Sequence, residues 1–327
     1  MANTDNIIEV KNLKKYFDVA SGELHAVDNL SFTIRRGETL GVVGESGCGK
    51  STLGRVLLHL LEPTGGQMFY NGQDITKVSR KELSELRKQM QMIFQDPYSS
   101  LNPRFTVFQT IAEPMEIAGG YTKQQIEERV YAMMDTVGLD RRLVNSYPHE
   151  LDGGRRQRIG IGRALILEPK FIVCDEPVSA LDVSIQAQII NLLLDIQEDQ
   201  KLTYVFVTHD MMVVKYISDR ILVMYMGEMA ELTDSKTLFE KPMHPYTKAL
   251  LSAVPVPDVD KQQERIILKG EVTSPINPQP GCRFAARCQY AKDVCFTKTP
   301  TPTEVEPGHL VACHYVAEIN ENLKTEV

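Results

Sequence analysis

A glycine-rich segment between a buried strand and a helix is the feature that most constrains the fold of this 327-residue chain. The residues "ETLGVVG" predict a buried strand that ends at Gly44, and "KSTLGRVLLHLL" predicts a helix, because its leucines recur at helical spacing. Between them, "GESGCGKS" (44–51) matches the pattern G-x-x-x-x-G-K-[ST], which surrounds phosphate groups. The alternative is a chance glycine turn, which the flanking strand and helix disfavour. The segment therefore predicts a phosphate site on an α/β fold.

The residue types in this segment have separate chemical roles. Glycines let the backbone turn its N–H groups around the β-phosphate, Lys50 neutralises phosphate charge, and the Ser51 hydroxyl is a ligand for Mg²⁺. The residues expected to bind the nucleotide phosphates are Gly44, Ser46, Gly47, Cys48, Gly49, Lys50, Ser51 and Thr52.

A second buried strand, "FIVCDE" (171–176), ends in two carboxylates. Since α/β sheets present ligands at the carboxyl ends of their strands, we expect Asp175 to hold Mg²⁺ and Glu176 to activate the attacking water as general base. The alternative is a solvated strand end. A nucleotide pocket already requires acids on a neighbouring strand, which favours the functional interpretation.

The remaining pattern predicts antiparallel strands at 7–17 and 25–35, helices at 123–138 and 184–198, and a buried strand at 203–210. Strands that alternate with helices indicate a largely parallel sheet with helices on both faces.

Charge and hydropathy limit the classes of function. The formal net charge of −7 argues against sequence-independent binding of nucleic acid, which requires a concentrated basic surface. The segment "MANTDNIIEVKN" has no secretion signal, and no apolar run approaches the roughly 20 residues of a membrane-spanning helix. We therefore expect a cytosolic protein that reaches a membrane only through partners.

Further motifs accompany the phosphate segment: "LDGGRRQRIGIGRAL" (151–165), "QMIFQDPYSSLNP", "CDEPVSALD", "VTHD", "HPYTKALLSAVP" (244–255) and a cysteine-containing tail. With these motifs, nearly the whole chain resembles the ATP-binding subunits of ABC transporters, specifically those of dipeptide and oligopeptide (peptide/nickel) uptake systems. The resemblance implies a P-loop NTPase α/β fold with an antiparallel β subdomain, a helical subdomain at about 96–168 and a C-terminal extension. The expected domains are a nucleotide-binding domain, 1–253, and an extension, 254–327.

The resemblance also assigns roles to individual residues. Phe17 takes the position of the aromatic side chain that stacks on adenine, and Tyr16 is the alternative. Gln95 is expected to contact Mg²⁺ and the attacking water, and His209 the γ-phosphate. The nucleotide of an opposing subunit is expected to contact Asp152, Gly153 and Gly154, while Ser179 to Asp182 line the dimer interface. The expected catalytic residues are Lys50, Gln95, Glu176 and His209, and the expected Mg²⁺ ligands are Ser51, Gln95 and Asp175.

The partners implied by the resemblance are a second ATP-binding subunit, two transmembrane permease subunits and, indirectly, an extracellular peptide-binding protein. The chain would then lie peripherally on the cytoplasmic face of the cell membrane. ATP would close the subunit dimer and hydrolysis would reset it. One alternative class is an ABC ATPase that works on ribosomes or DNA, which usually has two cassettes or a coiled-coil insert. A second alternative is a subunit that mainly binds nucleotide and has a regulatory role. The alternative cargo is nickel or another peptide-like compound.

One motif departs from the family pattern Leu-Ser-Gly-Gly-Gln, because this chain has Asp152 in place of serine and Arg155 in place of glutamine. Aspartate caps a helix as well as serine does. However, a carboxylate about 4 Å from a phosphate charge is repelled by roughly 4 kcal/mol at an effective dielectric constant near 20. Arg155, one turn away, offers a neutralising partner. The preferred hypothesis is a heterodimer in which the site completed by Asp152 is weak or regulatory.

The tail contains four cysteines with the spacing C-x5-C-x6-C-x17-C, namely Cys282, Cys288, Cys295 and Cys313. Structural zinc sites usually contain C-x2–4-C pairs, which these gaps do not match. Similar tails in the resembled family are associated with a [4Fe-4S] cluster, which is the preferred expectation. Zinc and free or disulfide-bonded cysteines remain alternatives. Since the tail has little apolar periodicity, a metal is expected to contribute to its folding.

Overall fold

The computed structural model describes residues 5–96, 98–254, 265–268, 270 and 274–320. The chain divides into two units. Unit 1 consists of Met1–Ile7, Arg35–Glu38 and Lys77–Phe206, and unit 2 of Ile8–Ile34, Thr39–Thr76 and Val207–Val327. None of the helices in the described part of the chain has the length and apolar character needed to cross a bilayer.

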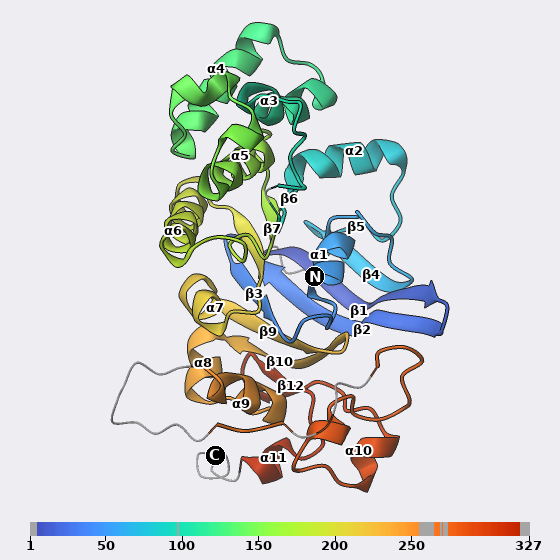
Figure 1. The fold of residues 1–327 in the computed structure, drawn as a ribbon. Coiled ribbons are helices and arrows are strands. Elements are labelled where there is room, and N and C mark those ends of the chain that lie inside the picture. Colours follow the sequence, from blue (N-terminus) through green and yellow to red (C-terminus); the bar gives the residue numbers. More distant parts are fainter. Residues whose placement is uncertain (1–4, 97, 255–264, 269, 271–273, 321–327) are drawn as a thin grey trace. The chain divides into compact units, whose positions relative to one another are not determined.

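Unit 1 contains parallel strands and the helices that follow them (Figure 1). Strand β6 (Met90–Ile93) pairs in parallel with β7 (Phe171–Asp175), and β8 (Thr203–Val207) is next to β7 in the strand order. All five residues of β7 are buried, as the uninterrupted apolar run predicts. The remaining elements of this part are α2 (Arg80–Gln89) and α6 (Val183–Gln200).

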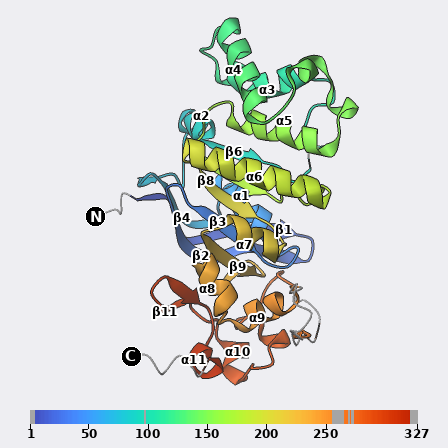
Figure 2. The same cartoon turned by 90° about the vertical axis from the view of Figure 1, so that its left-hand side faces the viewer.

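Three helices occupy the predicted helical segment of unit 1: α3 (Val107–Ala118), α4 (Lys123–Thr136) and α5 (Gly153–Leu165). They pack against one another (Figure 2). Capping boxes begin α3 and α4, where a threonine and a glutamine three residues later bond reciprocally to the exposed backbone N–H groups. The short 3₁₀ helices Arg141–Asn145 and Pro148–Glu150 lie between α4 and α5.

Unit 2 contains the predicted antiparallel β subdomain. Its strand order is β2-β1-β4-β5, and a turn at 20–21 joins the first two strands. Their bounds are β1 (Asn6–Val19), β2 (Gly22–Arg35), β4 (Gly65–Tyr70) and β5 (Gln73–Asp74).

A second set of strands in unit 2 has the order β11-β12-β10-β9-β3. Here β3 (Thr39–Val43) pairs in parallel with β9 (Arg220–Tyr225), whereas β10 (Glu228–Asp234), β12 (His309–Val311) and β11 (Thr303–Glu306) are antiparallel. The parallel arrangement predicted from the alternating strands and helices therefore holds for β3 and β9 but does not extend to the strand that follows β9. The physical reason is the two-residue turn Met226-Gly227, both residues with positive φ, because such a turn joins only antiparallel strands.

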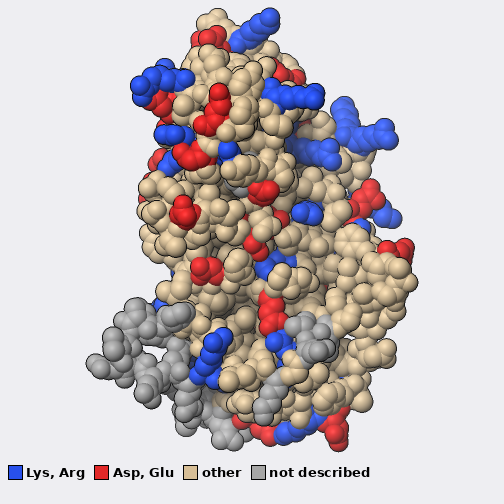
Figure 3. All heavy atoms as spheres, in the orientation of Figure 1, with Lys and Arg blue, Asp and Glu red and all other residues tan. Residues whose placement is uncertain are grey.

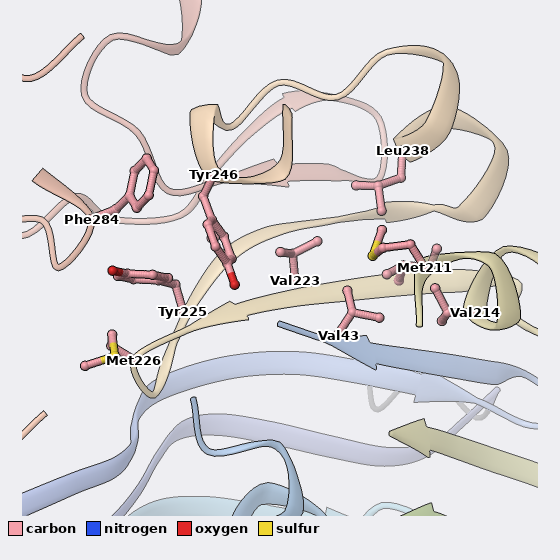
Figure 4. Close-up of a cluster of buried hydrophobic side chains, with 11 residues drawn as sticks. Val43, Met211, Val214, Val223, Tyr225, Met226, Leu238, Tyr246 and Phe284 are labelled. Atoms are coloured by element: carbon pink, nitrogen blue, oxygen red, sulfur yellow. The ribbon is translucent and has the colours of Figure 1, made fainter. Parts of the chain in front are cut away.

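The C-terminal extension shares the apolar core of unit 2. Phe284 is 3% exposed and packs edge-on against Tyr225 of β9, with Tyr246 close to both rings (Figure 4). β12 adds to the sheet beside β10. The extension therefore gains packing from the preceding domain, a contribution that its own sequence periodicity does not reveal. The helical elements of this region are α7 (Met211–Ile217), α8 (Ser235–Glu240), α9 (Pro245–Ser252), the 3₁₀ helix η3 (Ala285–Arg287), α10 (Asp293–Thr297) and α11 (Val316–Ile319).

Candidate functional site

The predicted phosphate loop in unit 2 connects β3 to α1 (Lys50–Leu57). Gly44, Gly47 and Gly49 all have positive φ, which side chains disfavour. A Cβ at Gly44 would lie 2.2 Å from the Met224 carbonyl oxygen, and a Cβ at Gly49 would lie 1.9 Å from that of Ala26. Two of the motif glycines are therefore required by close backbone contacts as well as by conformation.

Lys50 begins α1 and is only 5% exposed. Its ammonium group donates to the carbonyl oxygens of Gly44 at 2.8 Å and Glu45 at 3.0 Å. Ser51 and Thr52 follow it in the first helical turn, which contains no acidic side chain. A buried cation at the N-terminus of a helix provides the positive potential that phosphate oxygens require.

The aromatic candidates for adenine lie on β1. The Tyr16 hydroxyl donates to Asp28, and its ring stacks on His25 at 3.8 Å between centroids. Burial, followed by the hydrogen bond to Asp28, raises the pKa of Tyr16. One face of Tyr16 is therefore occupied within the protein. Phe17 is half-buried as well, and Lys15 lies over its ring at 4.9 Å from the centroid. The adenine contact of Phe17 stays a prediction.

His209 also belongs to unit 2. It follows β8 and is exposed, and the next residue, Asp210, caps α7 by accepting from the N–H groups of Met212 and Val213. The cap fixes where the helix begins, and so fixes the backbone beside His209. Its contact with a γ-phosphate stays a prediction.

In unit 1, the ends of two strands bring together the predicted acid–base residues. Ile93 of β6 is opposite Cys174 of β7, so the residues that follow these strands lie at the same edge. There the Gln95 amide Nε2 donates to the Glu176 carboxylate at 2.9 Å. This bond leaves the Gln95 carbonyl oxygen as the oxygen donor expected of a Mg²⁺ ligand.

The carboxylates at the end of β7 differ in environment. Asp175 is 2% exposed, whereas Glu176 is partly exposed and has φ of 46°. A non-glycine residue with positive φ is uncommon and carries conformational strain, which proteins often retain at functional sites.

The motif that differs from the family pattern at Asp152 and Arg155 forms the N-terminus of α5 in unit 1. The Asp152 carboxylate accepts from the Arg155 N–H at 2.8 Å, which confirms the predicted helix cap. The Arg155 guanidinium lies 3.2 Å from the other Asp152 oxygen, so the two side chains form an ion pair. Both side chains are more than half exposed, and pairs of this kind contribute about 0–1 kcal/mol.

The glycine pair beside Asp152 packs against the start of α6. A Cβ at Gly153 would lie 3.1 Å from Leu181 Cδ2, and a Cβ at Gly154 would lie 2.8 Å from Ile185 Cγ2. Asp182 takes the N-cap position of α6 and is exposed, although its side chain makes no capping hydrogen bond. The glycines therefore allow two helix N-termini to approach closely.

The four tail cysteines belong to unit 2. The Cys282 N–H donates to the Cys295 carbonyl at 2.7 Å. Burial, with smaller contributions from the neighbouring thiols of Cys295, Cys313 and Cys288, raises the pKa of Cys282 to about 12. Among the described residues, however, no three His, Cys, Asp or Glu side chains are arranged to hold a metal ion. The side-chain positions therefore give the predicted cluster no support.

Three residues near the phosphate loop were not predicted. Glu45 lies inside the loop motif, Tyr246 lies in "HPYTK", and Arg287 lies in the tail. Both Tyr246 and Arg287 form hydrogen bonds to Glu45. The His-Pro pair before Tyr246 is the available signal, since His244 caps α9 and proline suits its first position.

A lysine-containing loop suited to phosphate and a glutamate hydrogen-bonded to a glutamine at the sheet edge are parts expected of an ATPase. The glycine-paired N-terminus of α5, in the same unit as that glutamate, places the molecule in the class of ATP-binding cassettes.

The charged side chains on the face in Figure 3 are of both signs and interspersed.

Comparisons with known proteins agree with this class and refine it. Residues 27–179 match the ABC transporter family, and residues 230–295 match the family "Oligopeptide/dipeptide transporter, C-terminal region". The oligopeptide transport ATP-binding protein AppF of Bacillus subtilis is 51% identical, and the match covers 96% of this chain and 98% of AppF. The putative oligopeptide transport ATP-binding protein YkfD of the same organism is 52% identical, and the match covers 97% of this chain and 98% of YkfD.

Solved structures show the same fold. The cassette MJ0796, solved as a dimer in a post-hydrolysis state with ADP and Pi, is 28% identical with a TM-score of 0.64, and the match covers 70% of this chain and 98% of that one. Clostridium perfringens cbiO1, part of the transporter complex cbiONQ, is 29% identical with a TM-score of 0.65. The match covers 72% of this chain and 92% of cbiO1. The chain belongs to the ATP-binding subunits of oligopeptide/dipeptide ABC transporters, and its activity is ATP hydrolysis coupled to transport.

Proposed function

We propose that this subunit powers the import of dipeptides or oligopeptides through a membrane permease, with Glu176 as the general base for ATP hydrolysis. The observation that carries the catalytic proposal is the hydrogen bond of 2.9 Å between Gln95 and Glu176. It holds the carboxylate beside a side chain suited to Mg²⁺, at the edge of the sheet where α/β proteins bind ligands.

In the proposed reaction, a water oxygen forms a bond to the γ-phosphorus while Glu176 accepts the water proton. The bond from the γ-phosphorus to the bridging oxygen breaks, which releases phosphate and leaves ADP. Lys50 and His209 stabilise the charge on the phosphate oxygens. The family resemblance assigns Ser51, Gln95 and Asp175 as the residues whose oxygen atoms would hold Mg²⁺, and the bound ion would neutralise phosphate charge.

We further propose that the native assembly contains a second, different ATP-binding subunit. Asp152 offers only acceptor oxygens at a position where serine would donate a hydrogen bond to phosphate. Its ion pair with exposed Arg155 offsets about 0–1 kcal/mol of the roughly 4 kcal/mol repulsion expected near a phosphate charge. The site completed by Asp152 is therefore weak, and a homodimer would have two weak sites.

Steady-state ATP hydrolysis by the purified chain, at a concentration that permits dimers, tests this assembly. The double variant Asp152→Ser, Arg155→Gln should hydrolyse ATP at least tenfold faster than wild type. The matched control is Asp135→Ser, Arg141→Gln, which removes another exposed ion pair of unit 1 and should have no effect. Equal rates for wild type and the first variant would remove the physical basis of the heterodimer.

The peptide cargo rests on the match of residues 230–295 and on the relatives described as oligopeptide transport proteins. Two permease subunits and an external peptide-binding protein complete the proposed transporter, and they hold the chain peripherally on the cytoplasmic face of the membrane. Cells without this chain should lose uptake of a radiolabelled di- or tripeptide, and wild type but not Glu176→Gln should restore it. Normal peptide uptake with lost nickel uptake would instead assign nickel as the cargo.

The iron-sulfur cluster stays a prediction that rests on the resemblance and the four thiols. Anaerobic purification of the full chain followed by measurement of bound iron, acid-labile sulfide and absorbance near 400 nm tests it. About four irons and four sulfides per chain, lost in Cys288→Ser, would support the cluster. Zinc in place of iron, or no metal, would contradict it.

A further inference from the structure

Glu45, the residue after the first glycine of the phosphate loop, is held by two distant parts of the chain. Its N–H donates to the Tyr246 hydroxyl oxygen at 2.8 Å, and its carboxylate accepts from the Arg287 guanidinium at 2.8 Å. Tyr246 belongs to α9 and Arg287 to η3, so both contacts come from the C-terminal part of unit 2.

The ion pair between Arg287 and Glu45 is largely shielded from water. The Arg287 side chain is 10% exposed and that of Glu45 is 28% exposed. Arg287 also donates to the Tyr225 hydroxyl at 3.3 Å. Charge-assisted hydrogen bonds in such partly buried places are stronger than those of exposed pairs, and the Glu45 bond accordingly raises the pKa of Arg287.

The backbone of Glu45 connects this ion pair to the phosphate-binding lysine. The Glu45 carbonyl accepts from Lys50 at 3.0 Å, and from the Cys48 N–H at 3.3 Å. A movement of Glu45 would therefore change the position of the lysine and the curvature of the loop.

Packed aromatic rings restrict the positions of Tyr246 and of the segment that carries Arg287 (Figure 4). The Tyr246 ring is fully buried and meets Tyr225 with 4.7 Å between centroids, in an edge-on arrangement. Phe284, three residues before Arg287, lies 5.2 Å from Tyr225 and 5.4 Å from Tyr246. Aromatic clusters of this kind are rigid and restrict the positions of the attached hydroxyl and backbone.

We propose that Arg287 and Tyr246 are positioning residues of the ATP site, through which the C-terminal extension and α9 hold the phosphate loop in its binding conformation. Arg287 also neutralises the Glu45 carboxylate, which would otherwise add negative charge to a loop that binds polyphosphate. The proposal extends the ATP site and rests on ATP binding by this loop. It assigns to the extension a direct effect on nucleotide affinity.

The test measures the affinity of the purified full chain for Mg²⁺ and a non-hydrolysable ATP analogue. Arg287→Ala should weaken binding about tenfold, equivalent to about 1.4 kcal/mol, because the Glu45 charge is left unpaired. Adding Glu45→Gln to this variant should restore most of the affinity, and Glu45→Gln alone should tighten binding about threefold. Tyr246→Phe, which keeps the ring, should weaken binding about threefold.

Two controls separate the possible outcomes. Lys292→Ala removes an exposed ion pair of the extension, with Glu318, and should leave affinity unchanged. Lys50→Ala should abolish binding, and its failure to do so would reject the phosphate site itself rather than the role of Arg287.

The proposal is overturned if Arg287→Ala binds the ATP analogue as tightly as wild type does. It is also overturned if adding Glu45→Gln to Arg287→Ala restores no affinity. A tenfold loss in Glu45→Gln alone would overturn the charge-neutralising role of Arg287, because this variant lacks the negative charge that Arg287 is proposed to offset. Should Arg287→Ala fail to fold, Glu45→Gln and Tyr246→Phe decide the question, since both replacements keep the size of the side chain.

Discussion

The close approach of α5 and α6 makes Gly154 sensitive to the smallest substitution. In Gly154→Ala, the added Cβ would lie 2.8 Å from Ile185 Cγ2 and 3.5 Å from an Asp152 carboxylate oxygen. The γ-carbons of isoleucine are stiff within a helix, so the contact is relieved only by moving backbone. Overpacking of this kind destabilises the fold by about 1–3 kcal/mol. The higher helix propensity of alanine compared with glycine offsets up to about 1 kcal/mol of this loss.

Gly160 in the same helix supplies the matched control, because a Cβ there meets no atom within 4 Å. Gly160→Ala should therefore raise the free energy of unfolding, measured by urea denaturation followed by circular dichroism. Since the propensity gain is common to both variants, Gly154→Ala should be about 1–3 kcal/mol less stable than Gly160→Ala. Equal stability of the two variants would refute the packing argument for the glycine pair.

Two further predictions concern titration and adenine binding. Burial lowers the pKa of His244 from 6.5 to about 4, so the folded state keeps the neutral form and loses stability as pH falls through this range. His244→Asn keeps a helix cap without titrating, and wild type should lose about 3 kcal/mol more than this variant between pH 7 and 4 in urea denaturation. Phe17→Ala should weaken ATP binding in a fluorescent-nucleotide titration while Tyr16→Ala, which also removes a ring, does not, and the opposite result would assign adenine to Tyr16.

The elements around the phosphate loop and the acidic strand were predictable because local pattern determines them. A glycine motif between an apolar run and a helical leucine pattern needs no long-range information, and neither does the apolar run before Asp175. The cap formed by Asp152 was predictable for the same reason, since capping depends on residues three positions apart.

Features that depend on contacts between distant segments were not predictable. The ion pair of Arg287 with Glu45 joins residues 242 positions apart. The packing of Phe284 on Tyr225 likewise depends on tertiary structure, so a tail with little periodicity still acquired an apolar core. The antiparallel pairing of β10 with β9 depends on a turn at Met226-Gly227 that the alternating strand–helix pattern did not reveal.

Phosphate release by the assembled transporter, with either wild-type chain or Glu176→Gln, tests the central claim most directly. If Glu176 is the general base, the variant should bind ATP but lose at least about a hundredfold in kcat, the lower end of the effect expected for a lost base. Glu198→Gln, an exposed change on α6 of unit 1, should leave kcat unchanged. An unchanged kcat in Glu176→Gln would contradict the account and show that this subunit binds ATP while another performs the hydrolysis.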